Sequence, residues 1–291
     1  MDNSEYSRRT FLKFMGTSSL ALALSKSRLV AMMNHKASIG LQLYTVRRLI
    51  ENDFDATIRR IAEMGFAGIE TYDLPKSVEL NRAAKVFRDN GLKIFSMHVE
   101  LPVGDRRDYA LKLADAYDCD RVVYHGWPQG EKFKDMDATK RTAEAYNEAA
   151  AFLRTHGLRF GLHNHWWEYE KTDGVYPAYY LLEHLDKEIF FEIDTYWVKT
   201  AGQDPAKAVA DFGKRAPLLH IKDGPAVKGD RLYAQLPVGD GVMDFPAIVE
   251  AANGNTEWMI VEFDEYDKDI FDGIQKSYTY LTQHGLGEGK V

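Results

Sequence analysis

Histidines and carboxylates cluster in short segments of this chain, each at the end of a run of apolar, β-branched or aromatic residues. The clearest four are Leu-His-Asn-His (162–165), Glu-Ile-Asp (192–194), Leu-His-Ile-Lys-Asp (219–223) and Val-Glu-Phe-Asp (261–264). Side chains alternate between the two faces of a strand, so His163 shares a face with His165, and His220 shares one with Lys222. Segments of this composition can supply metal ligands and groups that transfer protons.

One residue from each of these four segments is a candidate metal ligand. The candidates are His163, Asp194, His220 and Glu262. Their mixed nitrogen and oxygen donors suit Mn, Co, Zn or Fe(II) and differ from the all-oxygen sites that Mg and Ca prefer. Such a set leaves coordination positions open for substrate oxygens. A metal ion bound there would act as a Lewis acid on a carbonyl or an enediolate.

Other apolar runs also end in polar residues, and aromatic residues stand close to the same ends. A single buried histidine or aspartate is usually structural, but polar residues at seven of the eight run ends favour one shared site. The aromatic residues are Tyr44, Tyr72, Trp127, Trp166, Trp167, Tyr196 and Trp197, of which about half are expected to be packing residues. Flat apolar faces stack on sugar rings while polar groups bind hydroxyls. We expect substrate contacts from Glu70, His125, Trp127, Trp167 and Trp197.

The polar segments belong to a regular alternation of strand-like and helical stretches. Eight continuous apolar runs, rich in Val, Ile, Phe and Tyr, lie at 39–46, 68–72, 93–99, 121–125, 159–165, 189–197, 217–222 and 258–263. Apolar strands separated by helices indicate a parallel sheet that is covered on both faces. Eight strand–helix units predict an α/β protein with a single (β/α)8 TIM barrel, whose active site lies at the carboxyl ends of the strands.

Helix signals stand between these runs. Phe54, Ile58 and Ile61 have helical spacing, and Gly65 is a stop signal. A cap and an early proline open further helices at Asp204 and Asp244. The longest connection, 223–243, is a candidate lid over the site.

The first residues of the chain have a different composition. Residues 1–31 combine Ser-Arg-Arg-Thr-Phe-Leu-Lys (7–13) with a short apolar run at 15–24, which predicts a twin-arginine export signal and a periplasmic location. The apolar run is too short to span a bilayer. The alternative is an amphipathic helix that packs on the barrel of residues 32–291. Export argues against phosphorylated metabolites as substrates, because those are retained in the cytoplasm.

The strand-end motifs resemble those of the xylose isomerase-like TIM-barrel family, also called the sugar phosphate isomerase/epimerase family. The resemblance covers the chain after residue 38 and implies a metal held by Glu, Asp, His and Glu from strands five to eight. Asp194, His220 and Glu262 match these positions, but His163 replaces the usual glutamate. Trp197 likewise replaces a histidine of many members. Glu168 is the alternative fifth-strand ligand.

The His-x-His pattern of strand five is similar to the inosose dehydratase branch of the family. In both branches a base removes the proton alpha to a carbonyl, and the resemblance implies Glu262 or His165 in that role. A second acid then returns the proton in an isomerase or epimerase, or protonates a leaving group in a lyase. His98, His125 and Lys222 are the candidates, with hydroxyl binding or packing at the rim as their alternative roles.

These motifs predict a metal-dependent isomerase or epimerase of a keto-sugar, with β-elimination on a 3-keto sugar, keto-glycoside or inosose as the alternative. A non-catalytic sugar-binding barrel is the alternative from another class. The net charge of −7 argues against nucleic acid as a partner and against an endonuclease-type barrel of this fold. We expect a small sugar as the partner, no stable membrane span, and a homo-oligomer as an open option.

Overall fold

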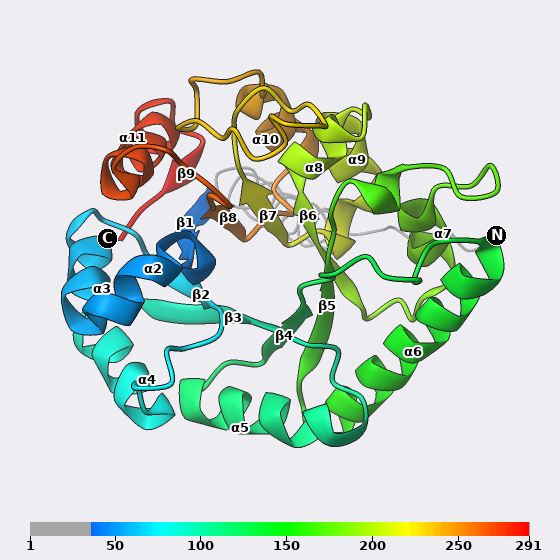
Figure 1. The fold of residues 1–291 in the computed structure, drawn as a ribbon, viewed down its shortest axis with the longest axis horizontal. Coiled ribbons are helices and arrows are strands. Elements are labelled where there is room, and N and C mark those ends of the chain that lie inside the picture. Colours follow the sequence, from blue (N-terminus) through cyan, green and yellow to red (C-terminus); the bar gives the residue numbers. More distant parts are fainter. Residues whose placement is uncertain (1–35, 291) are drawn as a thin grey trace, which may run out of the picture. The chain divides into compact units, whose positions relative to one another are not determined.

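Eight parallel strands close into a barrel in the computed structural model, which describes residues 36–290 (Figure 1). The strands follow one another around the barrel in chain order, and β1 pairs with both β2 and β8. The strands are β1 (Ala37–Gln42), β2 (Gly68–Thr71), β3 (Lys93–Val99), β4 (Arg121–Tyr124), β5 (Arg159–His163), β6 (Phe190–Asp194), β7 (Leu218–Ile221) and β8 (Trp258–Val261). A short β9 (Gly287–Glu288) pairs with the beginning of β1. The predicted single (β/α)8 barrel is confirmed, while the predicted export signal lies outside the described residues.

Helices surround the barrel and begin where capping side chains are available. They are α2 (Arg47–Asn52), α3 (Phe54–Glu63), α4 (Leu80–Asp89), α5 (Arg107–Tyr117), α6 (Met136–Thr155), α7 (Pro177–His184), α8 (Thr195–Thr200), α9 (Pro205–Phe212), α10 (Phe245–Ala252) and α11 (Ile270–Gln283). The side chains of Asp204 and Asp244 cap α9 and α10, as predicted. None of the helices within residues 36–290 is long and apolar enough to cross a membrane.

Four strands, β1, β5, β6 and β8, end two to four residues earlier than the sequence predicts. The side chain of Gln42 accepts a hydrogen bond from the Tyr44 amide, so the residues after it form a 3-10 helix, η1 (Leu43–Val46). Asp194 likewise accepts from the Trp197 amide and begins α8, while β5 ends at His163. Side-chain capping therefore overrides the apolar pattern, and it holds Asp194 at the edge of the barrel.

The amino-terminal half of the barrel interior is filled by aromatic rings. Phe95 and Trp258 stack with 3.9 Å between ring centroids and an interplanar angle of 11°. A Cβ atom at Gly40 would lie 2.4 Å from the ring of Phe95, and one at Gly161 would lie 2.2 Å from the ring of Phe190. Glycine is required at these positions because the rings occupy the space. Below the site the barrel is a packed apolar core.

The predicted lid, residues 223–243, is tied together at both of its ends by one carboxylate. Asp223 accepts hydrogen bonds from the amides of Gly224, Gly239, Gly241 and Met243. In the middle of this segment, the side chain of Gln235 donates to Asp264, a residue that lines the cavity described below. The segment therefore adjoins the site, and its movement as a lid stays a prediction.

Candidate active site and metal centre

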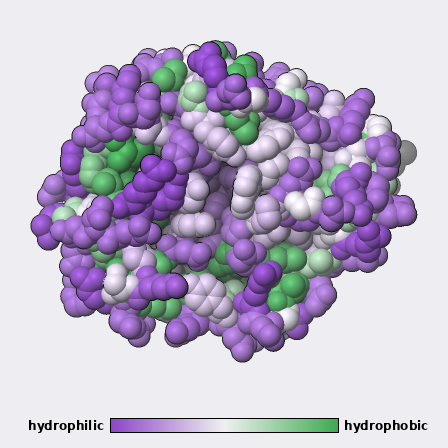
Figure 2. All heavy atoms as spheres, viewed as in Figure 1, coloured by the Kyte–Doolittle hydropathy of each residue, from purple (hydrophilic) through white to green (hydrophobic). Residues whose placement is uncertain are grey.

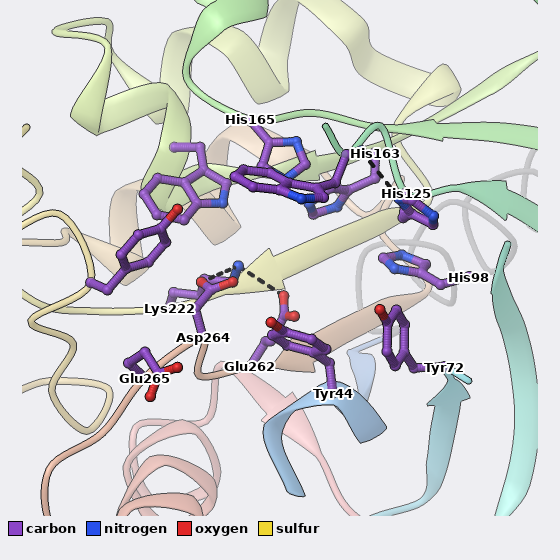
Figure 3. A pocket seen from close by; sticks show the side chains of 13 residues that line it. Tyr44, Tyr72, His98, His125, His163, His165, Lys222, Glu262, Asp264 and Glu265 are labelled. Atoms are coloured by element: carbon purple, nitrogen blue, oxygen red, sulfur yellow. Dashed lines mark hydrogen bonds and ion pairs between the residues drawn. The ribbon is translucent and has the colours of Figure 1, made fainter. Parts of the chain in front are cut away.

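A cavity of about 310 Å³ lies where the strands end (Figure 3), and Figure 2 shows a hollow in the middle of this face of the molecule. This volume is at the low end of the range, roughly 300–1,000 Å³, that small-molecule sites occupy. The cavity is lined by Tyr44, Tyr72, His98, His125, Trp127, His163, His165, Trp197, Lys222, Tyr233, Glu262, Asp264 and Glu265. Aromatic faces, imidazoles and carboxylates therefore share one small space.

The polar side chains at the base of the cavity form two clusters. The outer cluster, which adjoins the cavity, consists of Asp194, Lys222, Glu262 and Asp264. The inner cluster, which lies beneath it, consists of Glu70, His98 and Glu192. His163 and His220 belong to both, because each has one ring nitrogen near a carboxylate of either cluster.

In the outer cluster the predicted metal ligands converge. Nδ1 of His220 lies 2.6 Å from Oε2 of Glu262, and 4.0 Å from Oδ2 of Asp194. The ligand atoms of these three residues are close enough to hold one ion. Nε2 of His163 lies 3.9 Å from the same oxygen of Asp194. Three predicted ligands thus form a candidate metal site, with the fourth beside it.

Two observations show that these residues fit a divalent cation. Oδ2 of Asp194 is buried and, apart from an ion pair with Nζ of Lys222 at 3.0 Å, has no hydrogen-bond partner, although polar atoms in protein interiors are normally paired. In addition, the four buried carboxylates of Glu70, Glu192, Asp194 and Glu262 outnumber the two buried cations that they contact, the ammonium of Lys222 and the imidazolium of His220. Excess buried negative charge is costly unless a cation balances it. The donor set therefore fits a transition-metal ion.

Lys222 is the cation at the centre of the outer cluster. Its Nζ lies 3.0 Å from Oδ2 of Asp194, 2.9 Å from Oε2 of Glu262 and 2.8 Å from Oδ2 of Asp264. Burial raises the pKa of Asp194 to about 6, although the charge of Lys222 opposes that rise. For Glu262, burial is outweighed by the charges of Lys222 and His220, which hold its pKa well below the usual value. Glu262 is therefore ionised at neutral pH.

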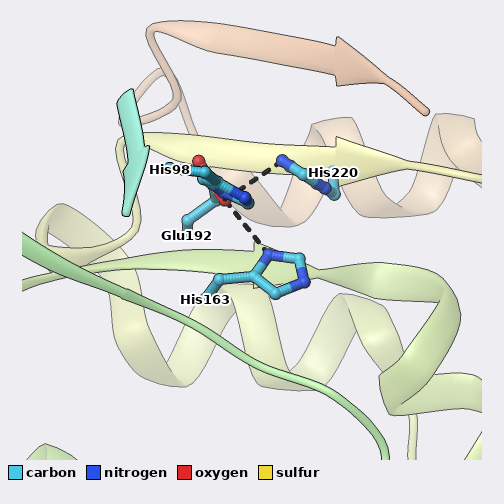
Figure 4. Close-up of side chains that lie close together, drawn as sticks. All are labelled: His98, His163, Glu192 and His220. Carbon is cyan, nitrogen blue, oxygen red and sulfur yellow. Dashed lines mark hydrogen bonds and ion pairs between the residues drawn. The ribbon is translucent and has the colours of Figure 1, made fainter. Parts of the chain in front are cut away.

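In the inner cluster, one carboxylate contacts three histidines from three strands (Figure 4). Oε1 of Glu192 lies 2.6 Å from Nε2 of His98, and 3.0 Å from both Nδ1 of His163 and Nε2 of His220. Glu192 was not among the predicted site residues. The available signal was its spacing, since a residue two before Asp194 on a strand points to the same side.

Comparisons with known proteins identify the family and the fold. The family model described as "Xylose isomerase-like TIM barrel" matches residues 58–284. The chain belongs to this xylose isomerase-like family. None of the curated protein sequences matches it significantly.

Solved structures share the fold of this xylose isomerase-like protein at low sequence identity. A sugar phosphate isomerase/epimerase from Parabacteroides distasonis is 23% identical, with a TM-score of 0.73 over 88% of this chain and 96% of that one. An L-ribulose 3-epimerase is 18% identical, with a TM-score of 0.66 over 86% and 94%. A probable 3-DHS dehydratase from Bacillus anthracis, involved in petrobactin synthesis, is 15% identical, with a TM-score of 0.68 over 84% and 98%.

Strand five carries the departure from the family pattern. Glu168, the alternative ligand to His163, points away from the metal candidates, because its Oε2 accepts a hydrogen bond from the His165 amide. It lines a separate small cavity behind the strand, and burial raises its pKa to about 7. In this xylose isomerase-like protein the described side chains of strand five therefore bring imidazoles, and no carboxylate, to the cavity.

The histidines that face the cavity are neutral at pH 7. Burial lowers the pKa values of His98 and His125 to about 4. Burial also holds the pKa values of His163 and His165 well below the usual value, with a neighbouring positive charge as the second cause in both. A neutral imidazole can bind a metal or accept a proton, so these side chains are in the required state.

Five predicted substrate-binding residues are placed in two groups. His125, Trp127 and Trp197 line the cavity, and the side chain of Trp127 is 49% exposed at its edge. Glu70 does not line the cavity, because it lies in the inner cluster. Trp167 stacks on His165 from behind, with 4.2 Å between ring centroids, and it also does not line the cavity. These two residues support other side chains of the site.

Two residues that line the cavity were missed by the sequence analysis. Tyr233 comes from the long segment 223–243 and packs edge-on against Trp197, with 5.8 Å between ring centroids. Glu265 follows the last strand and pairs with Arg47 at 2.8 Å. No pattern in the sequence marks Tyr233, whereas Glu265 stands directly after the recognised segment 261–264.

Proposed function

We propose that this chain is a metal-dependent enzyme that removes the proton alpha to the carbonyl group of a keto-sugar. The observation that carries the proposal is the convergence of Asp194, His220 and Glu262 at the base of an aromatic-lined cavity. His163 would complete the ligand set. A divalent cation held there would supply Lewis acidity toward a carbonyl oxygen, which favours ionisation of the adjacent C–H bond. An intact donor set also argues against a barrel that only binds sugar.

His165 and Glu262 are the candidate bases. Glu262 is engaged by His220 and Lys222, which makes its carboxylate less available as a proton acceptor. The ring of His165 has no hydrogen-bonded partner on Nδ1 and is held in place by stacking on Trp167. His165 is therefore the preferred base, with Glu262 mainly a ligand.

The charges around the cavity support an uncharged sugar as the substrate. The charged groups that line it are Glu262, Asp264, Glu265 and Lys222, and the ammonium of Lys222 is already surrounded by carboxylates. A phosphate or carboxylate on the substrate would meet net negative charge without a free basic partner in this lining. Aromatic side chains such as Tyr44, Tyr72 and Trp197 suit the apolar faces of a sugar ring.

Two outcomes can follow proton removal, and strand five bears on the choice. Epimerisation needs a second group that returns the proton to the opposite face, and the family's isomerases and epimerases use a strand-five glutamate for it. Here His163 is engaged by Glu192, and Glu168 points away. Elimination of a group beta to the carbonyl needs only an acid at the leaving group, for which His98 and His125 line the cavity. We therefore propose β-elimination as the second candidate reaction, beside isomerisation or epimerisation.

The deciding experiment is hydrogen exchange. The protein, loaded with Mn, Co or Zn, is incubated in deuterated water with neutral keto-sugars, keto-glycosides and their phosphate esters, and products are followed by NMR. We expect deuterium next to the carbonyl of neutral substrates, with little reaction of the esters. Unsaturated keto products would establish elimination, and epimers would establish the first candidate. Absence of exchange across the panel at full metal loading would contradict the proposal.

We also propose that the protein is exported by a twin-arginine signal in residues 1–31. The support is the sequence alone, with paired arginines before a short apolar run. Fractionation of the native host should find a shortened chain outside the cytoplasm. Replacement of Arg8 and Arg9 by lysine should retain it inside, whereas a full-length cytosolic protein in the unmodified strain would contradict export.

A further inference from the structure

The carboxylates of the inner cluster, Glu70 and Glu192, do not line the cavity, although His98 of the same cluster does. Glu192 is fully buried, and its Oε1 is shared by nitrogens of His98, His163 and His220. Oε1 of Glu70 lies 2.7 Å from Nε2 of His220 and accepts a hydrogen bond from Gln42, also at 2.7 Å. These two carboxylates therefore contact the histidines of the site and not a substrate in the cavity.

The two ring nitrogens of His163 face different environments. Nδ1 lies 3.0 Å from Oε1 of Glu192, whereas Nε2 lies 3.9 Å from Oδ2 of Asp194. An ionised carboxylate only accepts hydrogen bonds, so the nitrogen that faces Glu192 must carry the hydrogen. A neutral imidazole has one N–H, which leaves the lone pair on Nε2, directed toward the metal candidates.

His220 differs, because both of its ring nitrogens face carboxylates. Nε2 of His220 faces Glu70 and Glu192 in the inner cluster, and Nδ1 faces Glu262 in the outer cluster. By the same rule both nitrogens carry hydrogens in the metal-free protein, and the hydrogen on Nδ1 must leave before that nitrogen can bind a metal ion. With a metal bound in the outer cluster, both histidines thus keep an N–H group toward the inner cluster and direct their ligand nitrogen toward the outer one.

We infer that Glu192, assisted by Glu70, is a positioning residue that holds a hydrogen on the inner nitrogens of His163 and His220 and so directs a single metal ion to the outer cluster. Carboxylates behind metal-binding histidines orient the ring and raise its basicity as a ligand. The ligand atoms of His98, His163, Glu192 and His220 are also close enough to hold an ion. An ion there, beside one in the outer cluster, would require both nitrogens of His163 and of His220 as ligands, which a neutral imidazole cannot provide. The inference rests on the proposed function for its metal, but not for the tautomers.

The test uses the whole protein with two measurements. Co²⁺ titration, followed by the visible absorption of the ion, compares the native chain with Glu192→Gln and with the matched control Glu188→Gln. Glu188→Gln is the same substitution at an exposed position, where the native glutamate pairs with Arg154. We expect one ion per native chain, about 10–100-fold weaker binding and an altered spectrum for Glu192→Gln, and no change for the control.

The second measurement is ¹⁵N NMR of the histidine rings in metal-free protein, with His163 assigned from a His163→Asn variant. We expect the hydrogen on Nδ1 in the native chain and a mixture of tautomers in Glu192→Gln. If that variant does not fold, Glu192→Asp retains the charge and should give an intermediate metal affinity.

Three results would overturn the inference. They are a hydrogen on Nε2 of His163 in the native chain, unchanged Co²⁺ affinity in Glu192→Gln, or a second bound ion that this variant loses. If the native chain bound no metal, the proposed function would fail, and the tautomer measurement would still decide the role of Glu192.

Discussion

The inner and outer clusters are built from the same residue types, yet they differ in their contact with the cavity. In the inner cluster, Oε1 of Glu192 is shared by three histidine nitrogens, its Oε2 is buried without a hydrogen bond, and the residue does not line the cavity. In the outer cluster, Asp194 also keeps a buried oxygen without a hydrogen bond, but that oxygen faces His163 and Lys222, which line the cavity. Histidine and carboxylate content and an unsatisfied buried oxygen therefore do not locate a binding site; contact with a cavity does.

The largest effect is expected from removing a ligand of the outer cluster, which tests whether this cluster is the metal-binding site. Glu262→Gln should abolish deuterium exchange and bound metal together, because the amide loses the charge that a divalent cation needs. Metal content and exchange are measured on the same samples, with Glu250→Gln on the exposed face of α10 as the control. Full metal occupancy in Glu262→Gln would show that the outer cluster is not the binding site.

A change at the cavity wall should separate catalysis from metal binding. His165→Asn should retain the metal and lose rate by roughly 10²–10⁴-fold, as is typical when an acid–base group is removed. His184→Asn, an exposed change on α7, is the control. If His165→Asn loses its metal as well, or keeps its rate, then His165 is not the base.

The pH dependence of metal affinity should reveal the outer cluster directly. The pKa of His220 is raised well above its usual value because three carboxylates outweigh the effect of burial, so its proton must leave when the metal binds. Asp194, with a pKa raised by burial to about 6, is ionised above that pH and protonated below it. As the pH is lowered, the affinity for the metal should therefore fall roughly tenfold per unit down to pH 6 and roughly a hundredfold per unit below pH 6. Competition titrations measure this slope, and a flat profile from pH 8 to 5 would contradict it.

The smallest effect on chemistry is expected from the apolar floor beneath both clusters. Gly161→Ala would place a Cβ atom 2.2 Å from the ring of Phe190, so the interior must shift. Overpacking of this kind costs about 1–3 kcal/mol of the free energy of unfolding. Thermal unfolding should show a lower Tm, while metal content and rate per folded molecule stay near native values. A loss of metal without a loss of stability would mean that the floor and the clusters are coupled.

Much of this design can be predicted from the sequence, because it depends on local patterns. The order of strands and helices follows from apolar runs and capping residues such as Asp204 and Asp244. The period of two along a strand pairs His163 with His165 and His220 with Lys222, and the structure brings all four to the site. The barrel and three ligand candidates that lie close together can therefore be predicted from the sequence alone.

Other features depend on depth and direction inside the closed barrel, which no local pattern encodes. Glu168 is three residues from His165, yet it turns to the backbone behind the strand, and Trp167 supports His165 without reaching the cavity. Tyr233 reaches the cavity from a segment without a recognisable motif. The sequence determines which side chains share a face of one strand. Only the closure of the barrel sets the height of each strand against its neighbours, and this height decides that Glu192 lies beneath the metal candidates while Asp194, two residues later, stands among them.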